Sequence, residues 1–243
     1  MKKLITITMI LCLCFGMMCA FSGCNKDASD NGEAQAEQPK GEIETDDAPQ
    51  TGGWTVNGEF DSVQIPEDAQ KAFEKAMEGY TGDEMKPAAY LGSQVVAGVN
   101  YAYLCVTADP VTKLSIVTVY KDLDDNSEVL NVTPVEITNY TGDEAVFDTE
   151  ERAGGWTAEN ASGAVLPEDV QTAFDTAVKA VTDVDYMPLA YLGSQVVAGQ
   201  NYAVLCTATT DDAEPNVALA VVIIYADLSG EAKISSVSNF NIA

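Results

Sequence analysis

Apolar residues recur at spacings of three and four positions just after Pro66, and the positions between them are mostly polar or charged. This spacing is typical of a helix with one apolar face. Pro66, Glu67 and Asp68 also fit a helix start, where proline and acidic side chains are favoured. The pattern returns after Pro167, so we expect two helices. Their apolar positions are Ala69, Ala72, Phe73, Ala76, Met77 and Tyr80, and Val170, Ala173, Phe174, Ala177, Val178 and Val181.

Segments rich in β-branched and aromatic residues follow each expected helix, with polar or glycine-containing breaks between them. This composition indicates consecutive antiparallel strands. A helix and a sheet that each have an apolar side bury it by packing together, so the pattern predicts an α+β fold. The expected strands are residues 87–96, 99–108, 114–121 and 128–137, and residues 188–197, 200–208, 216–226 and 232–242.

The two halves of this pattern are copies of one unit. The run AYLGSQVVAG at residues 89–98 returns unchanged at residues 190–199, and Asn-Tyr-Ala follows one residue later in both places. Gly-Gly-Trp-Thr also precedes both helices. Each unit is about a hundred residues long, the size of a small domain rather than of a solenoid repeat. We expect a first domain over residues 52–140, a linker over 141–153 and a second domain over 154–243.

The N-terminus has the layout of a secretory signal over residues 1–23, because Lys2 and Lys3 precede an uncharged, largely apolar run. Small residues then precede Cys24, in a sequence similar to the lipobox of bacterial lipoproteins, where the cysteine is lipidated. A membrane-spanning anchor is the alternative, since the run approaches the length that spans a bilayer. We expect an exported, extracytoplasmic bacterial lipoprotein that the lipid on Cys24 anchors to the cell membrane.

Negative charge dominates the rest of the chain. Residues 24–51 are acidic and contain hardly any large apolar side chain, which predicts a disordered tether. Removal of residues 1–23 leaves 10 basic residues against 38 acidic ones, a net charge of about −28. This charge repels phosphates and anionic lipids, so we expect no nucleic-acid binding and no membrane binding beyond the lipid anchor. Solubility alone is the other explanation of the charge.

The residue types that enzymes and metal sites need are largely missing. The chain contains no histidine, which excludes Ser-His-Asp and Cys-His catalysis. Asp122, Asp124 and Asn126 are similar to the start of a calcium loop, but the required glycine and glutamate do not follow. Cys105 and Cys206 are expected to be buried core residues, with a disulfide between the copies as the alternative. We expect no enzyme activity, no cofactor and no metal.

Three motifs of each copy resemble the cystatins, and particularly their short members, the stefins. They are Gly-Gly before the helix, Gln-Val-Val-Ala-Gly followed by Asn-Tyr, and a second hairpin after Tyr120-Lys121-Asp122 in the first copy. The resemblance implies two tandem domains, each with an antiparallel sheet wrapped around one helix. It also implies inhibition of papain-like cysteine proteases, because in cystatins three such elements line up and plug the active-site cleft.

The resemblance assigns the protease contacts to a glycine trunk and two hairpins in each copy. An apolar hairpin tip that enters a groove gains about 25 cal/mol per Å² of apolar surface buried, and glycine permits the positive φ of a tight turn. Two alternatives stay open: the valine pairs are core residues of a strand, or the chain is a non-inhibitory adhesion or scaffold lipoprotein. The assigned residues are Gly52, Gly53, Gln94, Val95, Val96, Ala97, Gly98 and Leu123, and Gly154, Gly155, Gln195, Val196, Val197, Ala198, Gly199 and Leu228.

Overall fold

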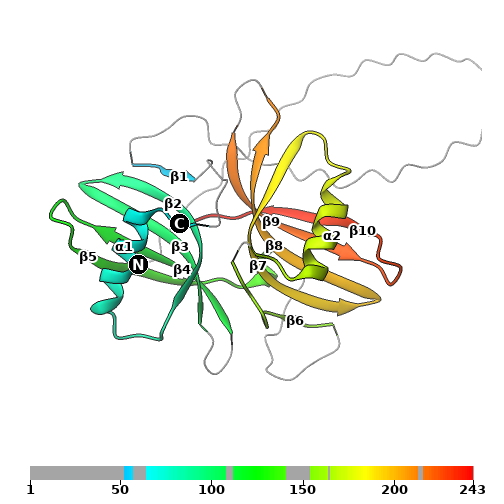
Figure 1. The fold of residues 1–243 in the computed structure, drawn as a ribbon, viewed down its shortest axis with the longest axis horizontal. Coiled ribbons are helices and arrows are strands. Elements are labelled where there is room, and N and C mark those ends of the chain that lie inside the picture. Colours follow the sequence, from blue (N-terminus) through cyan, green and yellow to red (C-terminus); the bar gives the residue numbers. More distant parts are fainter. Residues whose placement is uncertain are drawn as a thin grey trace, which may run out of the picture. The chain divides into compact units, whose positions relative to one another are not determined.

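Two five-stranded antiparallel sheets make up most of the described structure, and each copy of the repeat supplies one sheet and one short helix (Figure 1). The structure is a computed structural model. The secretory signal, Cys24, the tether and the linker expected over 141–153 lie outside the residues that it describes. The described residues are 52–56, 64–107, 112–140, 154–163, 165–212 and 216–242.

The first sheet has the strand order β1-β2-β3-β4-β5, so every strand pairs with its neighbours along the chain. From β2 to β5 the strands follow one another through short connections, whereas α1 lies in the connection between β1 and β2. The elements of this copy are β1 (Trp54–Val56), α1 (Glu67–Glu78), β2 (Lys86–Val96), β3 (Gly98–Thr107), β4 (Lys113–Lys121) and β5 (Ser127–Pro134), followed by the 3-10 helix η1 (Ile137–Tyr140).

The second sheet repeats this arrangement, with the order β10-β9-β8-β7-β6. Its three central strands are longer than their counterparts in the first copy, and its hairpins fall at the same sequence motifs. The elements are β6 (Trp156–Thr157), α2 (Glu168–Val178), β7 (Val184–Val197), β8 (Gly199–Thr210), β9 (Val217–Ala226) and β10 (Ala232–Asn239).

Both helices expected from the apolar spacing are present. Each begins directly after its proline, Pro66 or Pro167, and carries two acidic residues in its first turn. Helix α1 lies across its sheet near β4 and β5, and α2 lies across β9 and β10 (Figure 1). Four of the six apolar positions expected for each helix are buried, whereas Met77 and Val178 are half-buried and Tyr80 and Val181 lie beyond the helix ends. The buried positions are Ala69, Ala72, Phe73 and Ala76 in α1, and Val170, Ala173, Phe174 and Ala177 in α2.

The expectation of an α+β fold with each sheet wrapped around one helix is wrong. The structure is mostly β, and helices of 12 and 11 residues are too short to form the centre of five-stranded sheets. The strands also bury both of their faces. In β3, Tyr103 and Cys105 pack in the cluster that contains α1, whereas Ala102 and Leu104 belong to a different cluster. A single helix therefore covers only part of the apolar surface that each sheet must bury.

The sheet faces away from the helices contribute to a second hydrophobic cluster, which includes residues of both sheets. Leu104 and Ile116 come from the first sheet, and Leu205 and Val221 from the second. Consecutive apolar residues in a strand are typical of burial on both faces, whereas a half-exposed strand alternates. The runs in β3 and β8 follow the first pattern, which is why neither face of these strands is left to solvent.

Candidate functional site

The first hairpin of each copy ends in exposed valines. Strands β2 and β3 are joined through the single residue Ala97, and Val96 pairs with Gly98 across the turn. Val95 is 71 % exposed and Val96 is 43 % exposed. Neighbouring residues in a strand point to opposite faces, so apolar surface is present on both sides of the tip. The tip therefore extends beyond the part of the sheet that is packed into a core.

The matching hairpin in the second copy has the same form. Val196 and Val197 are 61 % and 40 % exposed, and Ala198 joins β7 to β8. The interpretation of the valine pairs as core residues is therefore wrong for both copies. They are among the exposed large apolar side chains of a protein whose buried core contains many other valines.

Glycine is required at the end of this turn for two reasons. Gly98 has a φ of +131° and Gly199 a φ of +126°, values that side chains with a Cβ rarely adopt. A Cβ on Gly98 would also lie 2.4 Å from the carbonyl oxygen of Lys121, and one on Gly199 would lie 2.4 Å from that of Ala226. The backbone of the neighbouring strand thus approaches the turn too closely for any other residue.

The glutamines of the motif hold the trunk rather than extending from the tip. The side-chain amide of Gln94 donates to the carbonyl oxygen of Gly52, and Gln94 accepts a 2.7 Å hydrogen bond from the side chain of Asn100. In the second copy, Gln195 Nε2 donates to Gly154 O at 2.8 Å, and Asn201 donates to Gln195 at 2.7 Å. Gln195 is only 8 % exposed. The glutamine therefore ties the glycine trunk to the first hairpin.

The trunk glycines themselves are exposed in both copies. Gly52 and Gly154 have φ values of +94° and +98°, and nothing lies within 4 Å of the place where a Cβ would be. Gly53 and Gly155 are exposed as well. Trp54 and Trp156, which follow the trunk, pack with the second hydrophobic cluster. The trunk thus combines an exposed backbone with an aromatic side chain that fixes it to the protein.

The second hairpin presents a leucine on a turn built by an aspartate. The carboxylate of Asp122 accepts hydrogen bonds from the backbone N–H groups of Asp124 at 2.9 Å and Asn126 at 2.7 Å, and from the Asn126 side chain at 2.9 Å. These hydrogen bonds, those from Asn126 above all, hold the pKa of Asp122 below its ordinary value. Leu123 is 84 % exposed at the tip of this turn.

The second copy builds the same turn with different neighbours. Asp227 accepts hydrogen bonds from the hydroxyl and the backbone N–H of Ser229, at 2.6 and 2.8 Å, and from the N–H of Glu231 at 3.0 Å. Its pKa is lowered for the same reason, mainly by the Ser229 hydroxyl. Leu228 is 91 % exposed. The Asp122 carboxylate, the first of the calcium-like groups in the sequence, thus accepts hydrogen bonds from its own turn.

All three elements lie at one end of each sheet, which we call the hairpin end. Trp54 pairs with Gln94, and Lys121 pairs with Val99, so the trunk lies on one side of the first hairpin and the second hairpin on the other. In the second copy, Trp156 pairs with Gln195, and Ala226 pairs with Gln200. The structure therefore brings together the residues that the sequence assigned to the trunk and the two hairpins.

Two tyrosines that the sequence analysis did not assign also act at the hairpin end. Tyr120, on β4, donates its hydroxyl hydrogen bond to the carbonyl oxygen of Ala97 at 2.6 Å. Tyr225, on β9, donates in the same way to Ala198 at 2.6 Å. The signal available in the sequence was their equivalent position in the two copies, each just before a second hairpin.

The hairpin ends of the two copies differ in the charged residues that they carry. In the first copy, Lys121 forms a 3.2 Å ion pair with Asp125, and the Lys75 ammonium donates to the backbone carbonyl of Asp125 at 2.7 Å. Asp124 is exposed beside Leu123. The second copy carries the uncharged Ser229 and Gly230 in place of Asp124 and Asp125, and the charged Glu231 in place of Asn126. Exposed ion pairs contribute little to stability, so the difference matters mainly for what the surface can contact.

Possible metal ligands and the two described cysteines are the other groups with candidate chemistry. Within the described ranges, no three side chains that could ligate a metal come together. Cys105 and Cys206 are both free and buried, so the alternative of a disulfide between the copies is wrong. Burial raises the pKa of the Cys105 thiol to about 12 and that of Cys206 well above its ordinary value. Thiols in this state are poor nucleophiles.

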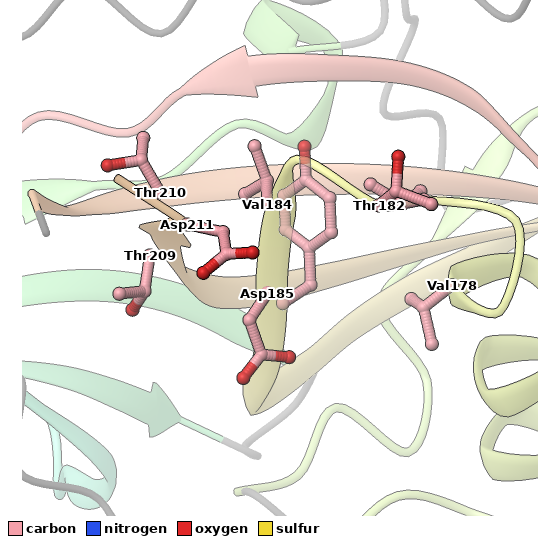
Figure 2. A pocket seen from close by; sticks show the side chains of 9 residues that line it. Val178, Thr182, Val184, Asp185, Thr209, Thr210 and Asp211 are labelled. Carbon is pink, nitrogen blue, oxygen red and sulfur yellow. The ribbon is translucent and has the colours of Figure 1, made fainter. Parts of the chain in front are cut away.

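A shallow pocket lies at the other end of the second sheet, where β7 begins and β8 ends (Figure 2). Figure 2 shows Asp185, Asp211 and Thr210 among the side chains that line it. Asp185 and Asp211 are exposed. The pocket therefore lies away from the valine tips, and it offers solvated carboxylates rather than a buried catalytic pair.

No helix in the described ranges has the length and apolar character needed to cross a bilayer. The lipid anchor proposed at Cys24 lies outside these ranges. Comparison with models of known protein families and with curated protein sequences finds no match for this chain.

Proposed function

We propose that this chain inhibits papain-like cysteine proteases, with each copy inserting its trunk and its two hairpins into an active-site cleft. The observation that carries the proposal is the exposure of two adjacent valines at the same hairpin in both copies, next to an exposed leucine. Exposed apolar groups that gather on otherwise polar surroundings mark interaction sites. The resemblance of the motifs to the cystatins supplies the class of partner.

The exposed side chains supply a substantial part of the binding energy that such a complex needs. Val95, Val96 and Leu123 would together contribute about 4 kcal/mol if a cleft buried the surface that they now expose to water. A micromolar complex requires roughly 8 kcal/mol. The remaining half must come from the trunk and from backbone contacts, which fits the total interface of about 1,600 Å² that protease inhibitors use.

The hairpin end is suited to inhibition rather than to cleavage. The tip is a tight turn at a glycine, and the trunk is tied to it by the glutamine. A preformed surface loses little conformational entropy on binding, so it binds more tightly than a flexible peptide of the same composition. Inhibition also requires no chemistry from the chain itself, which agrees with its lack of histidine.

We also propose that the chain acts as an exported lipoprotein, held at the extracytoplasmic face of the cell membrane by the lipid on Cys24. The acidic tether would place the hairpin ends some tens of Å from the lipid. An inhibitor in this position would meet proteases from outside the cell before they reach exported proteins.

A second candidate function is adhesion or scaffolding without inhibition. The observation that favours it is the exposed carboxylate of Asp124 beside Leu123, in a turn where Asp125 is paired with Lys121 at the surface. Removing charges from water at an apolar surface is unfavourable unless they are paired. A partner with basic groups would suit this hairpin better than an apolar cleft, and then the first copy would bind something other than a protease.

The test is titration of papain with the full-length protein in detergent micelles, beside a variant that carries Val95→Asp and Val196→Asp. The wild type should inhibit, and the double variant should inhibit at least 100-fold less, because its carboxylates would have to be desolvated in the cleft. The matched control is Val165→Asp, since Val165 is 74 % exposed but precedes α2. A wild type that leaves papain fully active at micromolar concentration would refute the proposal, and equal inhibition by all three would refute the assignment of the hairpins.

A further inference from the structure

In the turn of each first hairpin, one backbone carbonyl accepts a hydrogen bond from a side chain outside that hairpin. The carbonyl oxygens of Ala97 and Ala198 accept from the hydroxyls of Tyr120 and Tyr225, both at 2.6 Å. Ala97 and Ala198 are exposed, so water could satisfy these carbonyls instead. The tyrosine hydroxyls are therefore not needed to satisfy a buried carbonyl. Their effect must be to fix the position of the turn.

Each tyrosine comes from the strand that leads into the second hairpin. Tyr120 pairs with Asn100 and is followed by Lys121 and the turn at Asp122. Its hydroxyl therefore links the tip of the first hairpin to the base of the second. Neither hairpin can tilt away from the other without breaking this hydrogen bond.

The ring of the same tyrosine closes over the glycine. A Cβ on Gly98 would lie 2.8 Å from Tyr120 Cε2, and a Cβ on Gly199 would lie 3.0 Å from Tyr225 Cε2. The tyrosine thus holds the turn by two contacts, a packing contact of its ring and a hydrogen bond of its hydroxyl. Removal of the hydroxyl alone leaves the packing in place, which makes the second contact separable by experiment.

We propose that Tyr120 and Tyr225 are positioning residues, whose hydroxyls fix the first hairpin in the conformation that contacts the protease. The identity of the partner in this inference rests on the proposed function. The restraint on the hairpin rests on the hydrogen bonds alone. The same contact at the same distance in both copies carries it. Val96 and Val197 flank the bonded carbonyls, so a change in the turn moves them directly.

The expected effect follows from the fraction of molecules in the binding conformation. A hairpin that holds this conformation only part of the time binds more weakly by that fraction. The net contribution of one hydrogen bond corresponds to a change of about three- to tenfold in an equilibrium constant. We therefore expect Tyr120→Phe and Tyr225→Phe together to weaken inhibition by at most about three- to tenfold.

The experiment compares the full-length wild type in detergent micelles with this double variant by two measurements. The first is amide hydrogen exchange of the free proteins at residues 95–99 and 196–200, and the second is the inhibition constant against papain. Tyr186→Phe is the matched control, because Tyr186 lies near the start of β7, at the other end of the sheet. Faster exchange at both hairpins, with inhibition weakened by a similar factor, is the expected result.

The other outcomes overturn the inference in distinguishable ways. Unchanged exchange at the hairpins would mean that the hydroxyls do not hold them. Faster exchange with unchanged inhibition would mean that the fixed conformation does not matter for the protease. A wild type that does not inhibit papain would overturn the proposed function and with it the role in docking, while the exchange data would still show whether the hydroxyls order the tips.

Discussion

The two copies present the same first hairpin and different second hairpins. Residues 89–98 and 190–199 are identical, and the tip valines are exposed to a similar degree in both. The second hairpins share their turn geometry, the aspartate that accepts the hydrogen bonds of the turn and an exposed leucine. After the leucine, the first copy carries Asp124, Asp125 and Asn126, whereas the second carries Ser229, Gly230 and Glu231.

This difference distinguishes the residues that form the second hairpin from the residues that a partner would contact. Both copies retain the aspartate turn and the leucine, so these are the features that the second hairpin has in common in the two copies. The flanking residues differ in charge, and charged groups are harder to remove from water than a hydroxyl or a glycine. We therefore expect the second copy to bind an apolar cleft more tightly than the first.

Inactivation of one copy at a time should separate their affinities. Val196→Asp should weaken inhibition more than Val95→Asp, because it leaves only the copy with the acidic hairpin. Each variant should reduce the affinity of its own copy at least 100-fold, since an unpaired carboxylate would enter the cleft. The measurement is the inhibition constant of each single variant against papain. The reverse order of the two variants would contradict the account of the second hairpins.

Substitution of the turn glycines should affect the two copies equally. Gly98→Ala and Gly199→Ala should each destabilise the fold by about 2 kcal/mol, because a Cβ would meet a backbone carbonyl at 2.4 Å in both turns. Thermal unfolding measures this effect.

The matched controls for the turn glycines are Gly52→Ala and Gly154→Ala. These positions also have positive φ but nothing within 4 Å of a Cβ, so only the backbone strain remains. Equal losses in thermal midpoint at all four positions would show that the close approach of the neighbouring strand is unimportant.

Exchange of the second hairpins should transfer the difference in affinity. In a Val196→Asp background, Asp124→Ser with Asp125→Gly should strengthen inhibition by the first copy about fivefold to tenfold, because two charges leave the contact surface. Glycine also suits position 125, where Asp125 has a φ of +62°.

The reverse exchange introduces the acidic character of the first copy's second hairpin into the second copy. In a Val95→Asp background, Ser229→Asp should weaken inhibition by the second copy, while Gly230, whose φ of +90° disfavours a side chain, is kept. A first copy that became weaker on losing Asp124 and Asp125 would instead indicate that basic groups of the protease pair with them.

Acid should loosen the second hairpins, and this is the smallest effect that we expect. Hydrogen bonds lower the pKa of Asp122 and Asp227 below the ordinary value of 3.8, so folding favours their charged forms. Their stabilisation is complete above that ordinary value and is lost as the pH falls through the lowered folded-state pKa.

The measurement is the amide proton shifts of Asn126 and Glu231, whose N–H groups donate to these carboxylates. Both should titrate below pH 4. In Asp122→Asn, the shift of Asn126 should no longer follow that titration, while the shift of Glu231 in the other copy still should. Shifts that do not change between pH 6 and pH 2 would contradict the role of the carboxylates.

The sequence indicated both helices and four of the five strands in each sheet, but not β1 and β6, which follow the glycine trunk. Apolar spacing located both helices, because an amphipathic helix buries every third or fourth residue. The repeated Gln-Val-Val-Ala-Gly run located the first hairpin, since glycine ends the turn there. The composition of the β-rich segments, and the short polar or glycine-containing connections between them, also indicated an antiparallel meander.

The arrangement of the layers could not be inferred in the same way. The expectation of a sheet wrapped around one helix is wrong because it gives each sheet one apolar face, whereas the run Tyr101–Cys105 is apolar at every position and buried on both faces. The positioning tyrosines were missed because Tyr120 binds a carbonyl 23 residues earlier, a pairing that depends on strand register. The glutamines were assigned to the contact surface because a motif does not show which way a polar side chain points.

Hydrogen exchange of the full-length protein, free and in the presence of saturating papain, tests the assignment of the contact surface most directly. The account predicts protection at residues 95–98 and 196–199, with stronger protection at the second copy, and no change at the pocket of Figure 2. Inhibition of papain without protection at either hairpin would contradict it.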